Sequence, residues 1–309
     1  MAVDEAIANC VRVDHFTVEA VEALREAGVR PLLLKGPAIA QWLYAEDTTR
    51  RAYSDADLLV APSDLARAAV VLTELGYECV EPFDQRLPHS RPRHAECWYR
   101  TGDRSAIDLH RCIHGTERVS PGLVWQAATT DIASVDVLER TLDAPGEVFR
   151  LMHLVLHLRP KDHPGSRAWS DVEAAVAAVP VDSWQGAAEL ARRLGVDSRM
   201  GPLLRMVAGG DRVADRVHLP RVWPRWLRWE FNARSDAARF AAEIAEKPWP
   251  DGLLLLVERL VPPPSYLRSA QHVGDTLGAL VGGYIARLSN WRNGIAGLGS
   301  LRAERHGDP

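Results

Sequence analysis

Lysine is scarce in this sequence of 309 residues, which has only Lys35, Lys161 and Lys247 among its 37 basic residues. Acidic residues outnumber basic ones, and the formal net charge is -4. A protein that binds nucleic acid along an extended surface needs excess positive charge to neutralise the phosphates. The composition therefore excludes a broad nucleic-acid-binding surface but leaves room for a small anionic ligand.

Paired cysteines and long hydrophobic runs are also missing. The four cysteines form no Cys-x-x-Cys pair, which excludes a disulfide framework and a zinc ribbon. No run approaches ~18 uncharged apolar residues, and the first residues lack a basic segment followed by an apolar core. We therefore expect a cytoplasmic protein that does not enter a membrane.

The first 115 residues alternate between helical and strand patterns. Apolar spacing, Pro37 at a helix start, and Gly28 and Gly76 after helix ends predict helices over 14–27, 37–46 and 62–76. Short apolar runs predict strands over 29–36 and 53–61, and 94–100 and 105–111 should form a hairpin. These patterns indicate a small mixed-sheet domain that includes the N-terminal helix.

The rest of the chain has a helical period. Segments 145–159, 169–179, 184–195 and 238–247 repeat apolar residues at 3.6-residue spacing, and no strand is expected there. We expect an α+β protein with a domain at 1–115, an α-helical domain at 116–300 and a disordered tail at 301–309.

Two carboxylates stand one residue apart at the start of the second strand. Because side chains alternate along a strand, Asp55 and Asp57 share one face while Ala56 and Leu58 point into the core. If the later hairpin pairs beside this strand, Asp108 can join them. Three carboxylates at a sheet edge can hold two Mg²⁺ ions about 4 Å apart, a geometry suited to phosphoryl transfer.

The segment around Lys35 supplies features suited to a phosphate. Gly36 lets the backbone approach closely, the helix that begins near Pro37 offers N–H groups, and Lys35 adds a full charge. Carboxylates for a metal beside a phosphate site together indicate a nucleoside triphosphate (NTP).

A family resemblance runs through the stretches "LLLKGPAIAQWLYAEDTTRRAYSDADLLV", "ELGYECV" and "AIDLHR". They resemble an uncharacterised group of nucleotidyltransferases within the polymerase-β-like superfamily. Its pattern of Lys-Gly, Leu-Tyr, Arg-x-x-x-Asp-x-Asp-Leu-Leu-Val and Asp-Leu-His falls here on Lys35-Gly36, Leu43-Tyr44, Arg51 to Val60, and Asp108 to His110. Weaker similarity follows at 169–176 and 262–271.

The resemblance implies a role for each of these positions. Asp55, Asp57 and Asp108 would bind two Mg²⁺ ions, for which Mn²⁺ can substitute, and Asp108 would also activate the acceptor hydroxyl. Lys35, Gly36 and Arg51 would bind the triphosphate of ATP or another NTP, with Ser54 and His110 lining the site. The acceptor would be an unidentified small molecule or peptide, and the gene neighbourhoods of the family favour natural-product tailoring.

Other readings of these residues stay open. A lone Asp-x-Asp is often a solvated strand end, and Arg51 stands in an arginine-rich chain. His153 and His157 share a helix face, and a packing or capping pair is the simpler role beside zinc binding. His110 and His114, near Cys112, raise the same alternative, and we expect them to line the site.

The tryptophans of 222–231 can stack bases but more often form core or contact surface. At the level of function, a non-catalytic nucleotide- or partner-binding protein, and a phosphoryl or glycosyl transferase using the same metal site, are the alternatives.

Overall fold

The computed structural model describes residues 2–83, 89–233, 236–264, 276 and 278–284. The chain forms two compact units, one drawn from 1–83 and 93–222 and the other from 84–92 and 223–309. The tail at 301–309 and most of 262–271 lie outside the described residues. The functional division at residue 115 stays a prediction.

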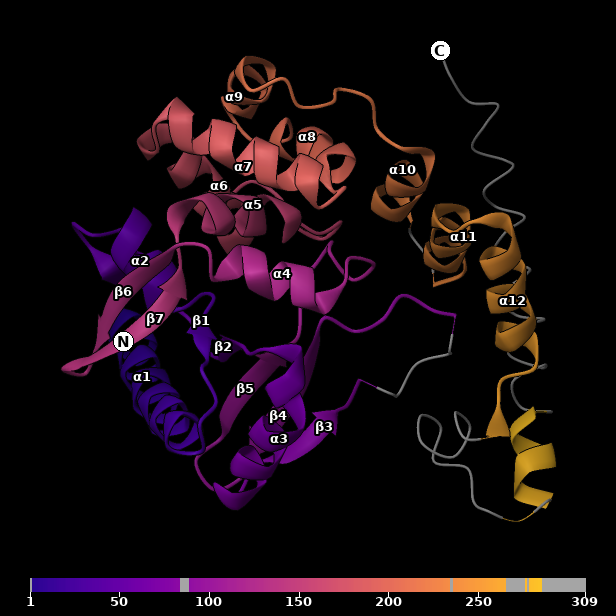
Figure 1. Ribbon diagram of the computed structural model, residues 1–309, viewed down its shortest axis with the longest axis horizontal. Helices are drawn as coiled ribbons and strands as arrows, with labels where there is room; N and C mark the ends of the chain where they lie inside the picture. Colours follow the sequence, from indigo (N-terminus) through magenta and orange to yellow (C-terminus); the bar gives the residue numbers. More distant parts are fainter. Residues whose placement is uncertain (1, 84–88, 234–235, 265–275, 277, 285–309) are drawn as a thin grey trace. The chain divides into compact units, whose positions relative to one another are not determined.

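The first unit contains a five-stranded mixed sheet in the order β1-β2-β5-β4-β3 (Figure 1). Its central pair, β2 and β5, is parallel, whereas all other neighbours are antiparallel. The predicted hairpin of 94–100 and 105–111 is confirmed as β4 and β5. The strands are β1 (Leu32–Leu33), β2 (Ala56–Leu59), β3 (Glu78–Glu81), β4 (Ala95–Arg100) and β5 (Ser105–His110).

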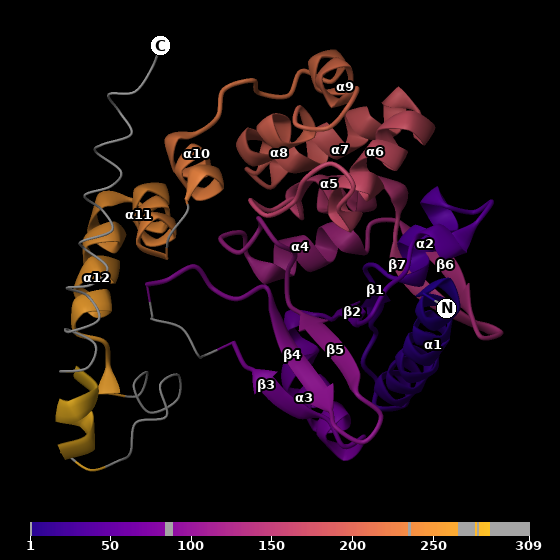
Figure 2. The same cartoon turned by 180° about the vertical axis from the view of Figure 1, so that it is seen from behind.

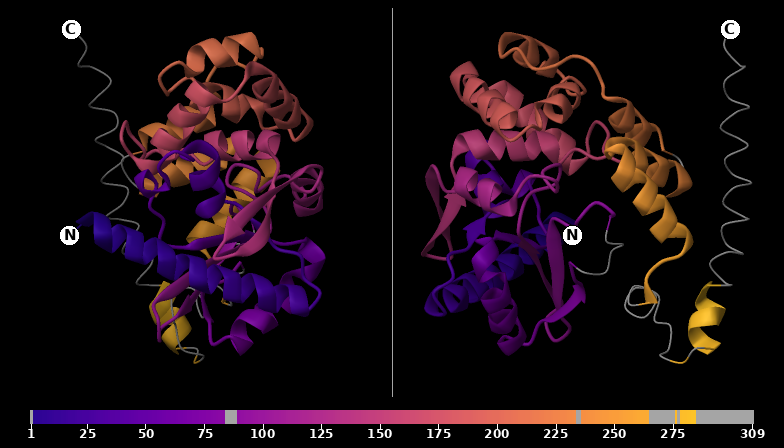
Figure 3. Two further views of the ribbon diagram at one scale, coloured as in Figure 1. Left: turned by 90° about the vertical axis from the view of Figure 1, so that its left-hand side faces the viewer. Right: turned by 45° about the vertical axis from the view of Figure 1, so that its right-hand side comes forward.

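Helix α1 (Ala2–Glu26), the long indigo helix in the left view of Figure 3, packs with this sheet around one hydrophobic core. Helix α3 (Leu65–Glu74) shares the same core. Buried residues of the two helices, such as Phe16 and Leu72, join Leu58 and Ile107 of the central strands. Burial of these apolar side chains is the main stabilising contribution. The helix stops predicted at Gly28 and Gly76 are confirmed, since both glycines have positive φ.

A second group of helices follows the sheet in the same unit (Figure 2). Helix α5 is central, because α6, α7 and α8 all contact it. All of its residues from Phe149 to Leu156 are buried. The helices are α4 (Pro121–Ala128), α5 (Glu147–Leu156), α6 (Arg167–Ala178), α7 (Val181–Arg193), α8 (Asp197–Leu204) and α9 (Gly210–Arg216).

The expectation that no strand follows residue 115 is wrong. Strands β6 (Ile132–Val137) and β7 (Arg140–Pro145) form an antiparallel hairpin, and β7 contacts β1. The turn residues Leu138 and Glu139 both have positive φ, a conformation that hairpin turns usually assign to glycine or asparagine. The usual turn signal is therefore absent from the sequence, although Val135, Val137 and Leu142 are buried.

The second unit consists mainly of helices α10 (Arg225–Asn232), α11 (Asp236–Glu246) and α12 (Trp249–Leu260). Arg91 joins two of them through ion pairs of 3.0 Å to Glu230 and 2.9 Å to Glu246. The ring of Trp223 packs edge-on against Phe231. Within the described helices, none is both long and apolar enough to cross a membrane.

Candidate active site

The parallel pairing of β2 with β5 brings the predicted carboxylates together. Asp57 and Asp108 are register partners on neighbouring strands, and Asp55 directly precedes β2. All three line one cavity of about 360 Å³. The expected sheet edge needs correction, because β2 and β5 are inner strands and the three carboxylates therefore lie within the sheet's width.

Asp57 is the most buried of the three carboxylates and has two cationic or polar neighbours. Lys35 Nζ donates a hydrogen bond of 2.6 Å to Asp57 Oδ1, and His110 Nε2 lies 3.0 Å from the same oxygen. Burial by itself would raise the pKa of Asp57, but Lys35 and His110 together hold this pKa well below its usual range. Asp57 is therefore ionised at neutral pH.

Asp55 and Asp108 have the opposite perturbation. Burial, and then the negative charge of Asp57, raise the pKa of each. Carboxylates that lie close together oppose each other's ionisation, because their negative charges repel. A divalent cation among the three carboxylates would relieve this repulsion.

Gly36 lies at the turn between β1 and α2 (Pro37–Leu43) and lines the same cavity. Its φ of 57° and ψ of -124° belong to a region that residues with a Cβ rarely adopt. The predicted Pro37 helix start is confirmed, but α2 has only seven residues.

Arg51 lies in the cavity wall, where it makes a buried ion pair. Its Nε and Nη2 atoms donate to the carboxylate of Asp171, and its Nη1 donates to the Gly36 carbonyl. Tyr44 also donates to Asp171, at 3.0 Å. Asp171 is a cavity residue that sequence reasoning missed as a site residue, although it lies in "WSDVEAAV", one of the weaker stretches of resemblance.

The cavity is also lined by residues after position 115. Arg159 and Lys161 lie between α5 and α6, Arg167 begins α6, and His153 and His157 come from the end of α5. Burial lowers the pKa of both histidines well below the usual range, so both rings are neutral. Only the histidine pair had a signal in the sequence, namely its four-residue spacing.

The residues expected to line the site differ in their placement. His110 is buried and contacts Asp57 directly, as described above, but neither it nor His114 is among the residues that line the cavity. Ser54 is exposed and is not among the residues that line the cavity, so its lining role has no support from this geometry.

Within the described residues, two clusters could hold a metal ion. One combines Asp57, Asp108 and His110, whose potential ligand atoms lie within 4.8 Å of one another. In this cluster both side-chain contacts that the described residues make with Asp57 go to Oδ1, which leaves Oδ2 for a cation. The carboxylate-rich donor set suits Mg²⁺, which prefers oxygen ligands.

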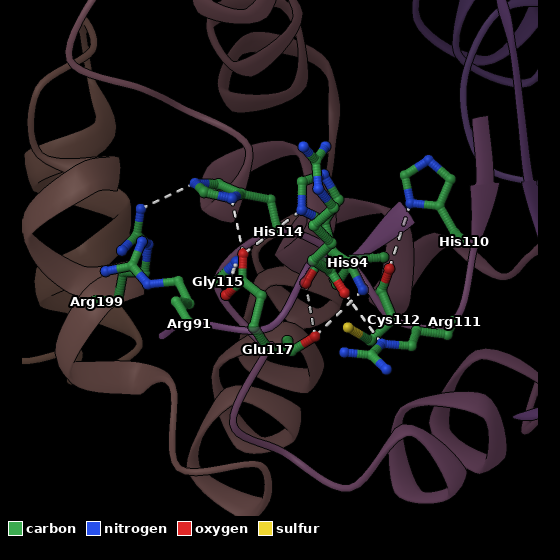
Figure 4. A network of polar contacts seen from close by, with 12 residues as sticks. Arg91, His94, His110, Arg111, Cys112, His114, Gly115, Glu117 and Arg199 are labelled. Atoms are coloured by element: carbon green, nitrogen blue, oxygen red, sulfur yellow. Dashed lines mark hydrogen bonds and ion pairs between the residues drawn. The ribbon is translucent and has the colours of Figure 1, made fainter. Parts of the chain in front are cut away.

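The other cluster combines His94, His114 and Glu117 (Figure 4). Arg199 Nη2 donates to His114 Nε2 over 3.1 Å, which places the histidine proton on Nδ1, 2.9 Å from Glu117 Oε1. Metal-bound histidines normally use their second nitrogen as a donor, and Arg199 cannot accept that proton. This arrangement favours a polar packing network over a zinc site.

Comparison with solved structures finds similar chains, two of which are described as a resistance factor and a nucleotidyltransferase-like protein. The protein is similar in structure to the antibiotic-resistance factor ANT(2'')-Ia, with 13% identity and a TM-score of 0.41 over 58% of this chain and 92% of the other. A nucleotidyltransferase-like protein from Paracoccidioides brasiliensis gives 17% identity and a TM-score of 0.33 over 61% and 91%. No match was found among curated proteins.

The family comparison covers more of the chain. The family described as uncharacterised nucleotidyltransferase matches residues 5–209, a range that contains the whole cavity. Because this match spans more than half of the sequence, the chain belongs to the uncharacterised nucleotidyltransferase family.

Proposed function

We propose that the protein transfers a nucleoside monophosphate from an NTP to a hydroxyl or phosphate group of a small molecule or peptide, with Mg²⁺ bound by Asp55, Asp57 and Asp108. The observation that carries this proposal is the pairing of Asp57 with Asp108 across two parallel strands, with Asp55 on the same cavity wall. Family membership supports nucleotidyl transfer as the reaction class.

For a hydroxyl acceptor, the acceptor oxygen forms a bond to the α-phosphorus of the NTP. The bond between that phosphorus and the oxygen bridging to the β-phosphorus breaks, and pyrophosphate leaves with the bonding electrons. The hydroxyl proton passes to Asp108, the residue to which the family resemblance assigns activation of the acceptor. Its pKa is raised, as is that of Asp55, and a raised pKa makes a carboxylate a better base than Asp57. Bound Mg²⁺ would stabilise negative charge on the attacking and leaving oxygens.

Both parts of the first unit contribute to the proposed site. The carboxylates precede residue 115, whereas Arg159, Lys161 and the two histidines follow it. We propose that 1–115 supply the metal-binding and catalytic residues and that the helices after them help to bind the substrates.

A transfer assay with mass detection tests this function. Wild type is incubated with Mg²⁺, each of the four NTPs, and panels of small-molecule and peptide acceptors, while pyrophosphate release and acceptor mass are followed. We expect an acceptor that gains one nucleoside monophosphate, and loss of this product in Asp57→Asn but not in the exposed control Asp211→Asn. An acceptor that gains a phosphate or a hexose instead would contradict the proposal.

A further inference from the structure

We propose that Arg159, Lys161 and Arg167 bind the β- and γ-phosphates of the NTP, a proposal that rests on the function proposed above. These three residues line the cavity that also contains the carboxylates. They replace Lys35 and Arg51, the residues to which the family resemblance assigns the triphosphate, as its main protein ligands.

Lys35 and Arg51 already have strong partners. Lys35 Nζ lies 2.6 Å from Asp57 Oδ1, and the side chain of Arg51 is 4% exposed and paired with Asp171. A phosphate that bound either cation would have to compete with a charge-assisted hydrogen bond to a buried carboxylate. The positive charges of Lys35 and Arg51 are thus largely compensated by Asp57 and Asp171.

The three proposed cations have no such partners. Among the described residues, the side chains of Arg159, Lys161 and Arg167 make no hydrogen bond or ion pair, and Arg159 Nε is buried without an acceptor. A buried donor without an acceptor is costly, and an anionic ligand would remove that cost. Arginine also binds phosphate oxygens through two parallel N–H groups.

The position of these cations fits the reaction as well. Arg167 lines the same cavity as Asp55. An α-phosphate beside the carboxylates would therefore leave the β- and γ-phosphates in the cavity that Arg159, Lys161 and Arg167 line. Two of the three lysines in the whole sequence, Lys35 and Lys161, line this one cavity.

The backbone of this loop is held in place without using the proposed cations. Asp162 Oδ2 accepts a hydrogen bond of 2.7 Å from the Arg159 N–H, and the Asp162 N–H donates to the Arg159 carbonyl at 2.9 Å. The side chains of Arg159 and Lys161 therefore extend from a fixed turn, which lowers the entropy lost when they bind an anion.

Calorimetric titration of the full-length protein tests the subsite. Dissociation constants are measured in Mg²⁺ for the four NTPs and the matching nucleoside monophosphates, with Lys161→Met, Arg167→Met, the double variant and the exposed control Arg193→Met. Lys161 and Arg167 are exposed, so their substitution should leave the fold intact. Loss of one charge-assisted contact should weaken NTP binding about tenfold.

We expect each single variant to weaken NTP binding about tenfold and to leave monophosphate binding unchanged, and Arg193→Met to behave as wild type. NTP binding that is unimpaired in the double variant would overturn the subsite while leaving the proposed function intact. Equal weakening of NTP and monophosphate binding would also overturn it. A wild type that binds none of the NTPs would overturn both proposals.

Discussion

At the scale of single residues, the three carboxylates of the cavity differ in their proton affinity although they lie side by side. Asp57 is held ionised by Lys35 and His110, whereas burial and the charge of Asp57 raise the pKa of Asp55 and Asp108. A protein without use for this repulsion would gain stability by replacing one of these aspartates. Such repulsion between carboxylates is expected at a site that binds a cation.

The repulsion leads to a prediction for Asp108→Asn. Because the folded pKa of Asp108 is raised, ionised Asp108 opposes folding above its unfolded pKa of about 3.9, and this penalty disappears as pH falls below that value. Without Mg²⁺, Asp108→Asn should therefore raise the free energy of unfolding at pH 7 by about 0.5–2 kcal/mol.

Urea unfolding of wild type and Asp108→Asn between pH 3 and pH 8 measures this effect. The gain should be present at neutral pH, vanish toward pH 3, and be accompanied by loss of transfer activity. A variant less stable than wild type at pH 7 would show that Asp108 has a favourable structural role instead.

Gly36 gives a second prediction at this scale. A Cβ on Gly36 would meet the Tyr53 ring at 3.6 Å, an ordinary contact, so the cost of Gly36→Ala comes from its positive φ. We expect a loss of about 1–3 kcal/mol in the free energy of unfolding. Gly102→Ala, where φ is not positive and no atom lies within 4 Å of the added Cβ, is the matched control and should leave stability nearly unchanged.

At the scale of elements, the Arg51–Asp171 ion pair ties α6 to the segment that leads into β2. Both side chains are almost fully buried, at 4% and 3% exposed. Removing one partner of such a pair leaves an uncompensated buried charge, whereas removing both does not. Asp171→Leu alone should lower the free energy of unfolding by about 3–5 kcal/mol.

A double-mutant cycle tests the coupling between these residues. Arg51→Met with Asp171→Leu should be clearly less destabilising than the sum of the two single variants, as measured by chemical unfolding. Additive effects would mean that the two side chains stabilise the fold independently of each other.

The same element scale divides what the sequence predicts from what it does not. The Asp-x-Asp strand, the Lys-Gly turn and the hairpin that carries Asp108 follow from local alternation and turn residues, and the structure confirms them as neighbours. The β6–β7 hairpin escaped prediction because its turn uses Leu138 and Glu139 at positive φ. Local propensity carries no signal for a turn that tertiary packing enforces.

At the scale of the whole molecule, the unpredicted part of the site is the part contributed by distant segments. Asp171 lies 120 residues from Arg51, and no local pattern in the sequence marks this pairing. The cations at 159, 161 and 167 likewise meet the carboxylates only after the chain has folded. The carboxylates could be predicted because each lies in or directly before a strand with a clear local pattern. Asp171 and the three cations could not, because their segments have no local pattern that places them beside the carboxylates.

The central claim is that the three carboxylates bind an NTP through Mg²⁺, and thermal unfolding of the whole chain tests it most directly. Wild type and Asp57→Asn are melted with each of the four NTPs, with and without Mg²⁺. An NTP at about 100 times its dissociation constant should stabilise the native state by roughly 2.7 kcal/mol. We predict that at least one NTP raises the Tm of wild type only when Mg²⁺ is present, and that Asp57→Asn loses this shift; an equal shift in the variant, or no shift in wild type with any NTP, would contradict the account.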